Sequence, residues 1–168
     1  FDSVYVEGIE MVTHSDIQYA AELGYRIKHL GVASRKEDGL DLRVHPCLVP
    51  EHQLLANVSG VMNAVLVKGD AVGETLYYGA GAGAGPTASA VVADLVDVVR
   101  TLTSDPGNRV PHLAFQPTRL AEPRFVSVSE AETAHYLRLT VMDQPGVLGE
   151  VTRILGDQGV SIRAISQK

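Results

Sequence analysis

Four glycines that alternate with alanine stand between a strand-like run and a helix-like run. In YYGAGAGAGPTASAVVADLVDVV these are Gly79, Gly81, Gly83 and Gly85. Because glycine has no Cβ, such a turn lets backbone N–H groups approach a ligand closely, and the helix N-terminus behind it adds a positive dipole. The turn could therefore contact a nucleotide or another planar or anionic ligand. It could equally be a tight strand-to-helix corner beside a neighbouring backbone, and spacing alone does not choose between the two.

Two common nucleotide-binding motifs do not fit this turn. The dinucleotide-binding fingerprint that starts at Gly79 and Gly81 is completed only loosely, by Ala84. It also requires an acidic residue at the end of a second strand about 20 residues later, where this sequence continues as one helix. The turn has no lysine for a phosphate-binding P-loop.

A second candidate turn is DQPGVL, residues 143–148. Asp143 can cap the following helix and offer a carboxylate to an ammonium group, while Gly146, Val147 and Leu148 can present free N–H groups to an anion. An amino acid carries both charges, so one turn could bind both of its ends. The alternative is that the turn only connects a strand to a helix.

The remaining reactive side chains favour structural or solvated roles. His29, His45 and His52 have no helical i, i+4 pairing, and nothing near Cys47 in the sequence would lower its pKa. Lys28 and Lys68 are lone lysines on strands, which are usually solvated. Glu7 and Asp16 lack the paired geometry of an acid–base dyad, and Asp94 and Asp97 are expected to face water or a neighbouring subunit.

The composition narrows the class of protein. Of the 168 residues, 45% are hydrophobic and 20% are charged, which predicts a packed core rather than disorder. The net charge of -6 without a basic stripe argues against nucleic acid and leaves small molecules or protein as partners. No apolar run approaches the roughly 20 residues that span a bilayer, nothing resembles a signal peptide, and the single cysteine fits a reducing cytosol.

The first half of the sequence predicts a helix followed by β-strands. The helix covers residues 13–23, with Ser15 as its cap and Gly24 as its end. Strands at 25–35 and 40–49 form a hairpin across KEDG, and Pro46 and Pro50 indicate that the second strand lies at a sheet edge or ends near them. A short helical turn (HQLLAN) and two more strands follow, VMNAVLVKGD and GETLYYG.

The second half predicts two helices around a linker. Residues 86–103 form a helix whose broad apolar face is expected to pack against a sheet, and residues 104–134 form a proline-containing linker with an extended piece paired elsewhere. Strands at 137–141 and 160–166 flank a helix that Pro145 opens. This last β-α-β unit cannot bury both faces of its sheet alone.

Three long segments resemble the catalytic and dimerisation region of homoserine dehydrogenase. They are YVEGIEMVTHSDIQYAAELGYRIKHLGVA, LRVHPCLVPEHQLLANVSGVMNAVLVKGDAVG and GAGAGAGPTASAVVADLVDVVR, and the resemblance covers residues 1–104. It implies an oxidoreductase that interconverts L-aspartate 4-semialdehyde and L-homoserine with NADP or NAD. It also implies that Gly83, with Gly81 and Ala82 beside it, contacts the nicotinamide end of the cofactor.

The same resemblance implies a part of a longer enzyme. The dinucleotide-binding domain of the family, and the acidic segment with the catalytic lysine that precedes YVEGI, have no counterpart in this sequence. No catalytic residue is therefore expected here, and the chain by itself is predicted to be inactive.

The sequence HYLRLTVMDQPGVLGEVTRILGDQGVSIRAISQ resembles the first half of an ACT domain, a regulatory module of amino-acid pathways. The resemblance implies effector binding at Asp143, Gly146, Val147 and Leu148, with threonine as the feedback effector. It also implies a homo-oligomer, a dimer or tetramer, because the half-module leaves an open sheet edge.

Together these features predict an α+β fold with a mixed β-sheet covered by helices and a partial β-α-β, ferredoxin-like unit. The expected domains are residues 1–104, a linker at 105–134 and the ACT half at 135–168. The expected setting is cytoplasmic, without membrane, nucleic acid or metal. The rival hypothesis is a stand-alone amino-acid-sensing or dimerisation module without catalysis.

Overall fold

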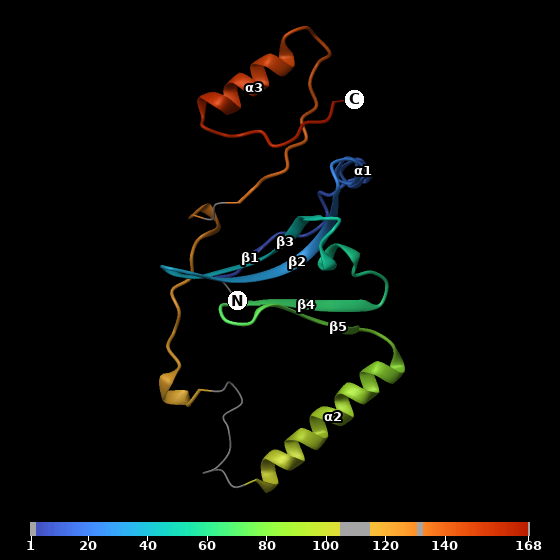
Figure 1. Cartoon of the computed structure of the whole chain (residues 1–168), viewed down its shortest axis with the longest axis vertical. Coiled ribbons are helices and arrows are strands. Elements are labelled where there is room, and N and C mark those ends of the chain that lie inside the picture. Colours follow the sequence, from blue (N-terminus) through green and yellow to red (C-terminus); the bar gives the residue numbers. More distant parts are fainter. Residues whose placement is uncertain (1–2, 105–114, 131–132, 168) are drawn as a thin grey trace. The chain divides into compact units, whose positions relative to one another are not determined.

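The computed structural model describes residues 3–104, 115–130 and 133–167 and confirms the α+β class (Figure 1). The chain divides into two compact units. The first unit joins Phe1–His52 to Phe125–Lys168, and the second is Gln53–Arg124. Each unit is described by itself below.

A long antiparallel hairpin forms the centre of the first unit. Strands β2 (Tyr25–Lys36) and β3 (Gly39–Pro50) pair along their whole length, from Tyr25 opposite Pro50 to Lys36 opposite Gly39. The two residues between them lie in the KEDG sequence, so the predicted hairpin is confirmed. A short parallel strand, β1 (Tyr5–Val6), pairs with β3 and makes β3 the central strand of three.

Of the two positions that the prolines of β3 allowed, the sheet edge is wrong for the strand as a whole, while the strand does end at Pro50. Successive residues of a strand direct their backbone groups to alternate edges. The carbonyl of Val44 accepts a hydrogen bond from the Glu7 N–H at 2.8 Å, so Val44 faces β1. Pro46 faces the same side two residues later, where the pairing with β1 has ended. The missing N–H therefore falls on a locally open edge.

The same edge of β3 also pairs with a segment of the predicted linker. Phe125 forms a parallel bridge with Leu40, and the Val126 N–H donates to the Leu40 carbonyl at 2.9 Å. The expectation of an extended, paired piece within residues 104–134 is confirmed at this point. A second piece of the linker, η3 (Val128–Glu130), follows as a single 3-10 turn.

Helix α1 (His14–Glu22) lies between β1 and β2 in the chain and starts from a capping box. Its cap is Thr13 rather than the predicted Ser15, because Thr13 has the extended backbone of a cap and its side chain accepts from the Asp16 N–H. Ser15 lies inside the first turn. The predicted end is confirmed, since Gly24 follows with φ at 80°.

The core of the first unit is small and includes charged groups. Among the described residues, its buried apolar side chains are Ala20 and Val49, and Asp16 and Asp41 are also buried. On β3, the Nε of Arg43 lies 2.9 Å from Asp41 Oδ1, with Arg43 13% exposed. Residues two apart on a strand share a face, so this ion pair forms within one strand.

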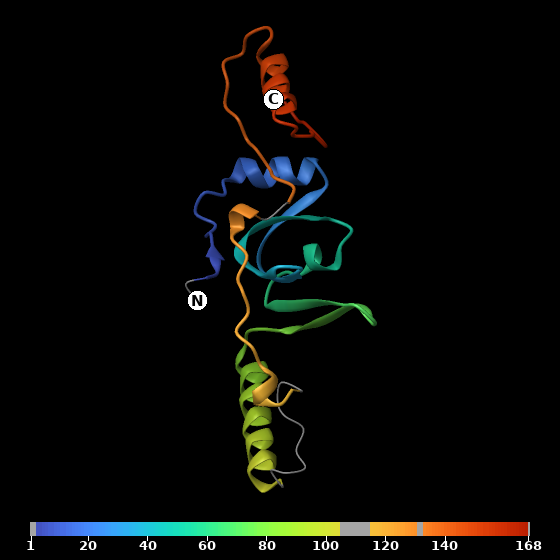
Figure 2. The same ribbon diagram turned by 90° about the vertical axis from the view of Figure 1, so that its left-hand side faces the viewer.

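The second unit contains a hairpin followed by a long helix (Figure 2). The short helical turn is η1 (Leu54–Asn57), and strands β4 (Met62–Gly69) and β5 (Gly73–Ala80) pair in antiparallel register. Helix α2 (Ala84–Thr103) follows, two residues longer at its start than predicted, and η2 (Pro117–Arg119) is a single 3-10 turn. The sequence predicts that Pro106 and Gly107 end this helix, and both lie outside the described residues.

The apolar face of α2 is not packed against a sheet, contrary to the prediction. No residue of α2 is buried. The exposed apolar residues include Val91, Val92, Leu95, Val96, Val98, Val99 and Leu102. The periodicity indicates that this face needs a cover, and the described part of the chain does not supply it.

The C-terminal segment contains the predicted helix, α3 (Val147–Asp157), without the predicted strands on either side. In a split β-α-β arrangement another strand lies between the two that flank the helix. No described residue fills that place, so the segments at 137–141 and 160–166 lack the partner that would make them strands. Pro145 does not open the helix, because Gly146 is its cap.

Candidate functional site

The glycine turn leads directly into the N-terminus of α2. Its cap is Gly83, with φ 113° and ψ 146°, and no side chain caps the helix. The first helical bond runs from the Thr87 N–H to the Gly83 carbonyl at 3.1 Å. Pro86 has no N–H, so Ala84 and Gly85 carry the donors at this end of the helix. The arrangement offers two backbone N–H groups and a positive dipole without a competing side chain.

The glycine at position 81 has a separate structural reason. Its N–H donates to the Val61 carbonyl at 2.8 Å, which extends the β4–β5 hairpin into the turn. A Cβ at Gly81 would overlap the side-chain amide of Asn63 on β4. The structure therefore brings Gly81, Ala82 and Gly83 together at one helix end. Both interpretations of the turn, as a ligand contact and as a tight corner, are compatible with this geometry.

The turn before α3 also ends in a glycine cap. Gly146 has φ 92° in the left-handed region, and the Glu150 N–H donates to its carbonyl at 3.0 Å. Asp143 is exposed and does not cap the helix as predicted, because Gly146 occupies that position. The Val147 N–H is not free either, since it donates to the Gln144 carbonyl at 3.4 Å. Leu148, the last of the three residues predicted to offer an N–H group to an anion, lies in the first turn of α3.

The carboxylate of Asp16 has contacts on both of its oxygens. Its Oδ2 accepts from the Thr13 backbone N–H at 2.8 Å and from the Thr13 hydroxyl at 2.6 Å. Its Oδ1 accepts from the Tyr136 hydroxyl at 3.0 Å and lies 2.7 Å from the Nε of Arg138. One oxygen thus holds the start of α1, and the other holds a segment 120 residues away.

These contacts change the pKa values of the groups involved. The hydrogen bond from the Thr13 hydroxyl is the largest cause that lowers the pKa of Asp16, to about 2. Burial opposes it, while the Thr13 N–H, Tyr136 and Arg138 add to it. The pKa of Tyr136 is raised, first by burial and then by its hydrogen bond to Asp16.

Sequence reasoning missed this role of Asp16. The spacing of Thr13 and Asp16 is that of a capping box, which was the available local signal. The partners on the other oxygen are distant in the sequence, and no local pattern indicates them. The alternation of Tyr136 and Arg138 with leucines shows that these two share a face, but not what that face contacts.

His29, His45 and Cys47 contact other residues of the first unit. His29 Nε2 lies 2.9 Å from the Glu7 backbone oxygen, and His45 lies against Tyr5, with ring centres 6.3 Å apart. Cys47 Sγ is 3.5 Å from His45 Nδ1, and burial raises the pKa of the thiol. A thiol with a raised pKa is a poor nucleophile. Within the described ranges, no group of three or more His, Cys, Asp or Glu residues is placed to hold a metal.

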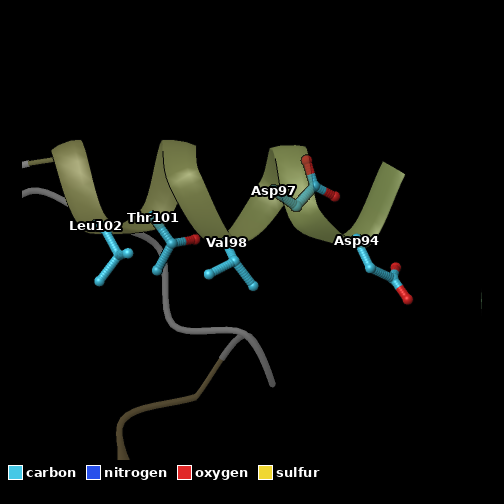
Figure 3. Close-up of a pocket in the computed structure, with 5 residues that line it drawn as sticks. All are labelled: Asp94, Asp97, Val98, Thr101 and Leu102. Atoms are coloured by element: carbon cyan, nitrogen blue, oxygen red, sulfur yellow. The ribbon is translucent and has the colours of Figure 1, made fainter. Parts of the chain in front are cut away.

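A shallow hollow beside α2 does not amount to a binding site. All the side chains that line it come from this one helix, and Val98, Thr101 and Leu102 point to one side (Figure 3). Asp97 is exposed and pairs with Arg100 at 3.4 Å, as expected for a solvated face. No second element contributes a polar group.

Comparison with known proteins identifies the family. A family model described as homoserine dehydrogenase matches residues 1–96, and one described as ACT domain matches residues 135–168. The chain belongs to the homoserine dehydrogenase family. The domain boundaries expected at 104 and 134 stay a prediction.

Several relatives match nearly the whole chain. A homoserine dehydrogenase of Pseudomonas aeruginosa is 61% identical over all of this chain and 39% of its own length, and one of Neisseria gonorrhoeae is 54% identical over the same shares. A crystal structure of a homoserine dehydrogenase from Thiobacillus denitrificans is 62% identical, with a TM-score of 0.89 over 99% of this chain and 38% of that one. The chain thus spans about two-fifths of these curated relatives. Among the described helices, none is long and apolar enough to cross a membrane.

The Asp16 contacts predict an acid-sensitive contribution to stability. Because the folded-state pKa, about 2, lies below the ordinary value of 3.8, this stabilisation is complete above about pH 4 and is lost as the pH falls towards 2. Asp16→Asn is expected to lower the free energy of unfolding by about 1–3 kcal/mol at pH 7, measured by urea denaturation, and to flatten this acid limb.

The matched control is Asp157→Asn, which removes an exposed carboxylate paired with Arg153 at 2.8 Å. Its effect is expected to stay below about 0.5 kcal/mol. Equal effects of the two substitutions would contradict the assignment of Asp16 as a buried anchor.

Proposed function

We propose that this chain is the catalytic, dimerisation and regulatory part of an NAD(P)-dependent homoserine dehydrogenase. The enzyme would interconvert L-aspartate 4-semialdehyde and L-homoserine in threonine, methionine and isoleucine biosynthesis. The supporting observation is that one chain carries both the homoserine dehydrogenase segment at 1–96 and an ACT segment at 135–168. All of this chain is also 61% identical to part of a homoserine dehydrogenase of Pseudomonas aeruginosa.

The glycine turn is proposed as the contact with the nicotinamide end of the cofactor, NADP or NAD. The nicotinamide would supply or accept the hydride. The Ala84 and Gly85 N–H groups suit the oxygen of a neutral carboxamide, and the cap position at Gly83 leaves the approach without a side chain. Gly81 and Ala82 would shape the approach, because the Asn63 amide already lies against Gly81. The chain's own contribution is therefore to position the cofactor.

The turn before α3 is proposed as the effector site. The Leu148 N–H at the start of the helix would bind the carboxylate of an amino acid, and the exposed Asp143 would bind its ammonium group. Gly146 and Val147 form the backbone between these two groups. Threonine, an end product of the proposed pathway, is the expected effector.

The protein is proposed to act as a cytoplasmic homo-oligomer, a dimer or tetramer. Strands β4 and β5 expose apolar residues on both faces of their hairpin, including Val65 and Tyr77 on one face and Leu66 and Tyr78 on the other. A two-stranded hairpin is marginal in water without a covering surface. A cover from other parts of the enzyme or from a second subunit would stabilise it.

A chimera tests the proposed activity. This chain replaces the matching segment of the Pseudomonas aeruginosa enzyme, and homoserine-dependent reduction of NADP and NAD is followed by absorbance. The chimera is expected to turn over, and the chain by itself is expected not to. A folded chimera without turnover would contradict the proposal, and would favour a stand-alone sensing module if the chain still bound threonine.

Two glycine-to-alanine substitutions test the cofactor contact in the same chimera. Gly83→Ala forces a side chain into a backbone region that costs of order 1–3 kcal/mol, so kcat/KM for the cofactor is expected to fall about 10- to 100-fold. The control is Gly79→Ala on β5, where the added Cβ meets open space, and its effect is expected to stay within about threefold. If Gly83→Ala lowers thermal stability but leaves cofactor kinetics unchanged, the turn is only a structural corner.

A further inference from the structure

The Asp16 carboxylate joins the two family segments of the chain. Asp16 lies in the homoserine dehydrogenase segment, while Tyr136 and Arg138 lie at the start of the ACT segment. The Tyr136 hydroxyl and the Arg138 Nε meet the same oxygen, Oδ1, at 3.0 and 2.7 Å. Two donors on one buried oxygen fix both the position and the direction of the incoming segment.

This contact can open without releasing α1. Oδ2 keeps its two hydrogen bonds from Thr13 when Oδ1 loses its partners. The Arg138 side chain is 40% exposed, so water can solvate its guanidinium as the pair separates. The structure shows the closed contact, and an open one would keep the Thr13 bonds, as a two-state element requires.

The polar contact leaves the apolar side of the ACT segment available. In an extended segment alternate residues face opposite sides, so Tyr136 and Arg138 share one side while Leu137, Leu139 and Val141 face the other. Those three apolar residues are exposed. The segment can therefore join a sheet through its apolar side and contact Asp16 through its polar side.

The contact between Asp16 and Arg138 is also close in sequence to the proposed effector turn. Arg138 precedes Asp143 by five residues, with no helix between them. At its other end, Asp16 stands in the first turn of α1, which leads through Gly24 into β2, a long strand of the first unit's sheet. A rearrangement of the effector turn would therefore be transmitted to this sheet through the side chain of Asp16.

We propose that Asp16 is a positioning residue that couples effector binding at the ACT segment to the dehydrogenase segment, through its contacts with Tyr136 and Arg138. The effector acts by changing the balance between the closed and open contact. The inference rests on the proposed function, because it requires both an effector response and turnover.

The test measures inhibition by L-threonine in the active chimera described above. Arg138→Gln and Tyr136→Phe each remove one donor to Oδ1 and leave the Thr13 bonds in place. Each is expected to change the threonine concentration for half-inhibition at least fivefold, while KM for homoserine and uninhibited kcat stay within about twofold. A coupling change of this size lies in the usual range of about 1–3 kcal/mol.

The matched control is Arg153→Gln, which removes an exposed arginine from the ACT segment that pairs with Asp157 on α3. It is expected to leave half-inhibition within about twofold. Threonine binding to the variants, measured by calorimetry, separates coupling from a damaged effector site. Retained binding with altered inhibition supports the proposal.

Three results would overturn it. One is unchanged inhibition in both Arg138→Gln and Tyr136→Phe, with the proposed function intact. A second is an equal shift in Arg153→Gln, which would show a general effect of lost positive charge. The third is an active wild-type chimera that binds or responds to no threonine, which removes the effector role together with this coupling but leaves the dehydrogenase activity standing.

Discussion

The backbone pairing of β3 is the constraint on which the first unit depends. One edge of β3 is filled by β2 along the whole hairpin. The other edge receives two short pieces that are distant in the sequence, β1 with Glu7 at Val44, and Phe125 with Val126 at Leu40. Because both pieces bond to the same edge, the chain that continues from each is kept in one neighbourhood.

The Asp16 contact follows from that arrangement. Asp16 lies ten residues after Val6, and Tyr136 lies ten residues after Val126. Two tethers of similar length that leave one strand edge can meet, and a buried carboxylate with four donors makes the meeting specific. The link between the dehydrogenase segment and the ACT segment is thus a consequence of how β3 is paired.

Local chemistry was sufficient to predict most elements. The KEDG turn, Gly24 after α1 and the apolar period of α2 are each determined by residues within a few positions of one another. Pro46 was misread because a proline excludes pairing on one edge of a strand, not on both. The strands expected around α3 failed for a different reason, since a strand needs a neighbour that its own sequence does not describe.

The residues of the candidate sites also divide into those that a local sequence pattern indicates and those that it does not. The glycine caps Gly83 and Gly146 lie in the two turns that the sequence indicated, but the sequence predicted Asp143, not Gly146, as the cap of α3. The partners of Asp16 could not be found from sequence, because its second oxygen is satisfied from 120 residues away. The exposed face of α2 is an intermediate case, in which the pattern shows that a cover is required and the described chain does not contain it.

The most direct measurement of the central claim is a carboxyl-carbon NMR titration of Asp16 in this chain, repeated in Arg138→Gln. The closed contact predicts a pKa of about 2 for Asp16 in the unsubstituted chain and a higher pKa once Arg138 is replaced. An Asp16 pKa that is the same in both proteins would contradict the link between the two segments, because the Thr13 bonds that lower it most are present in each.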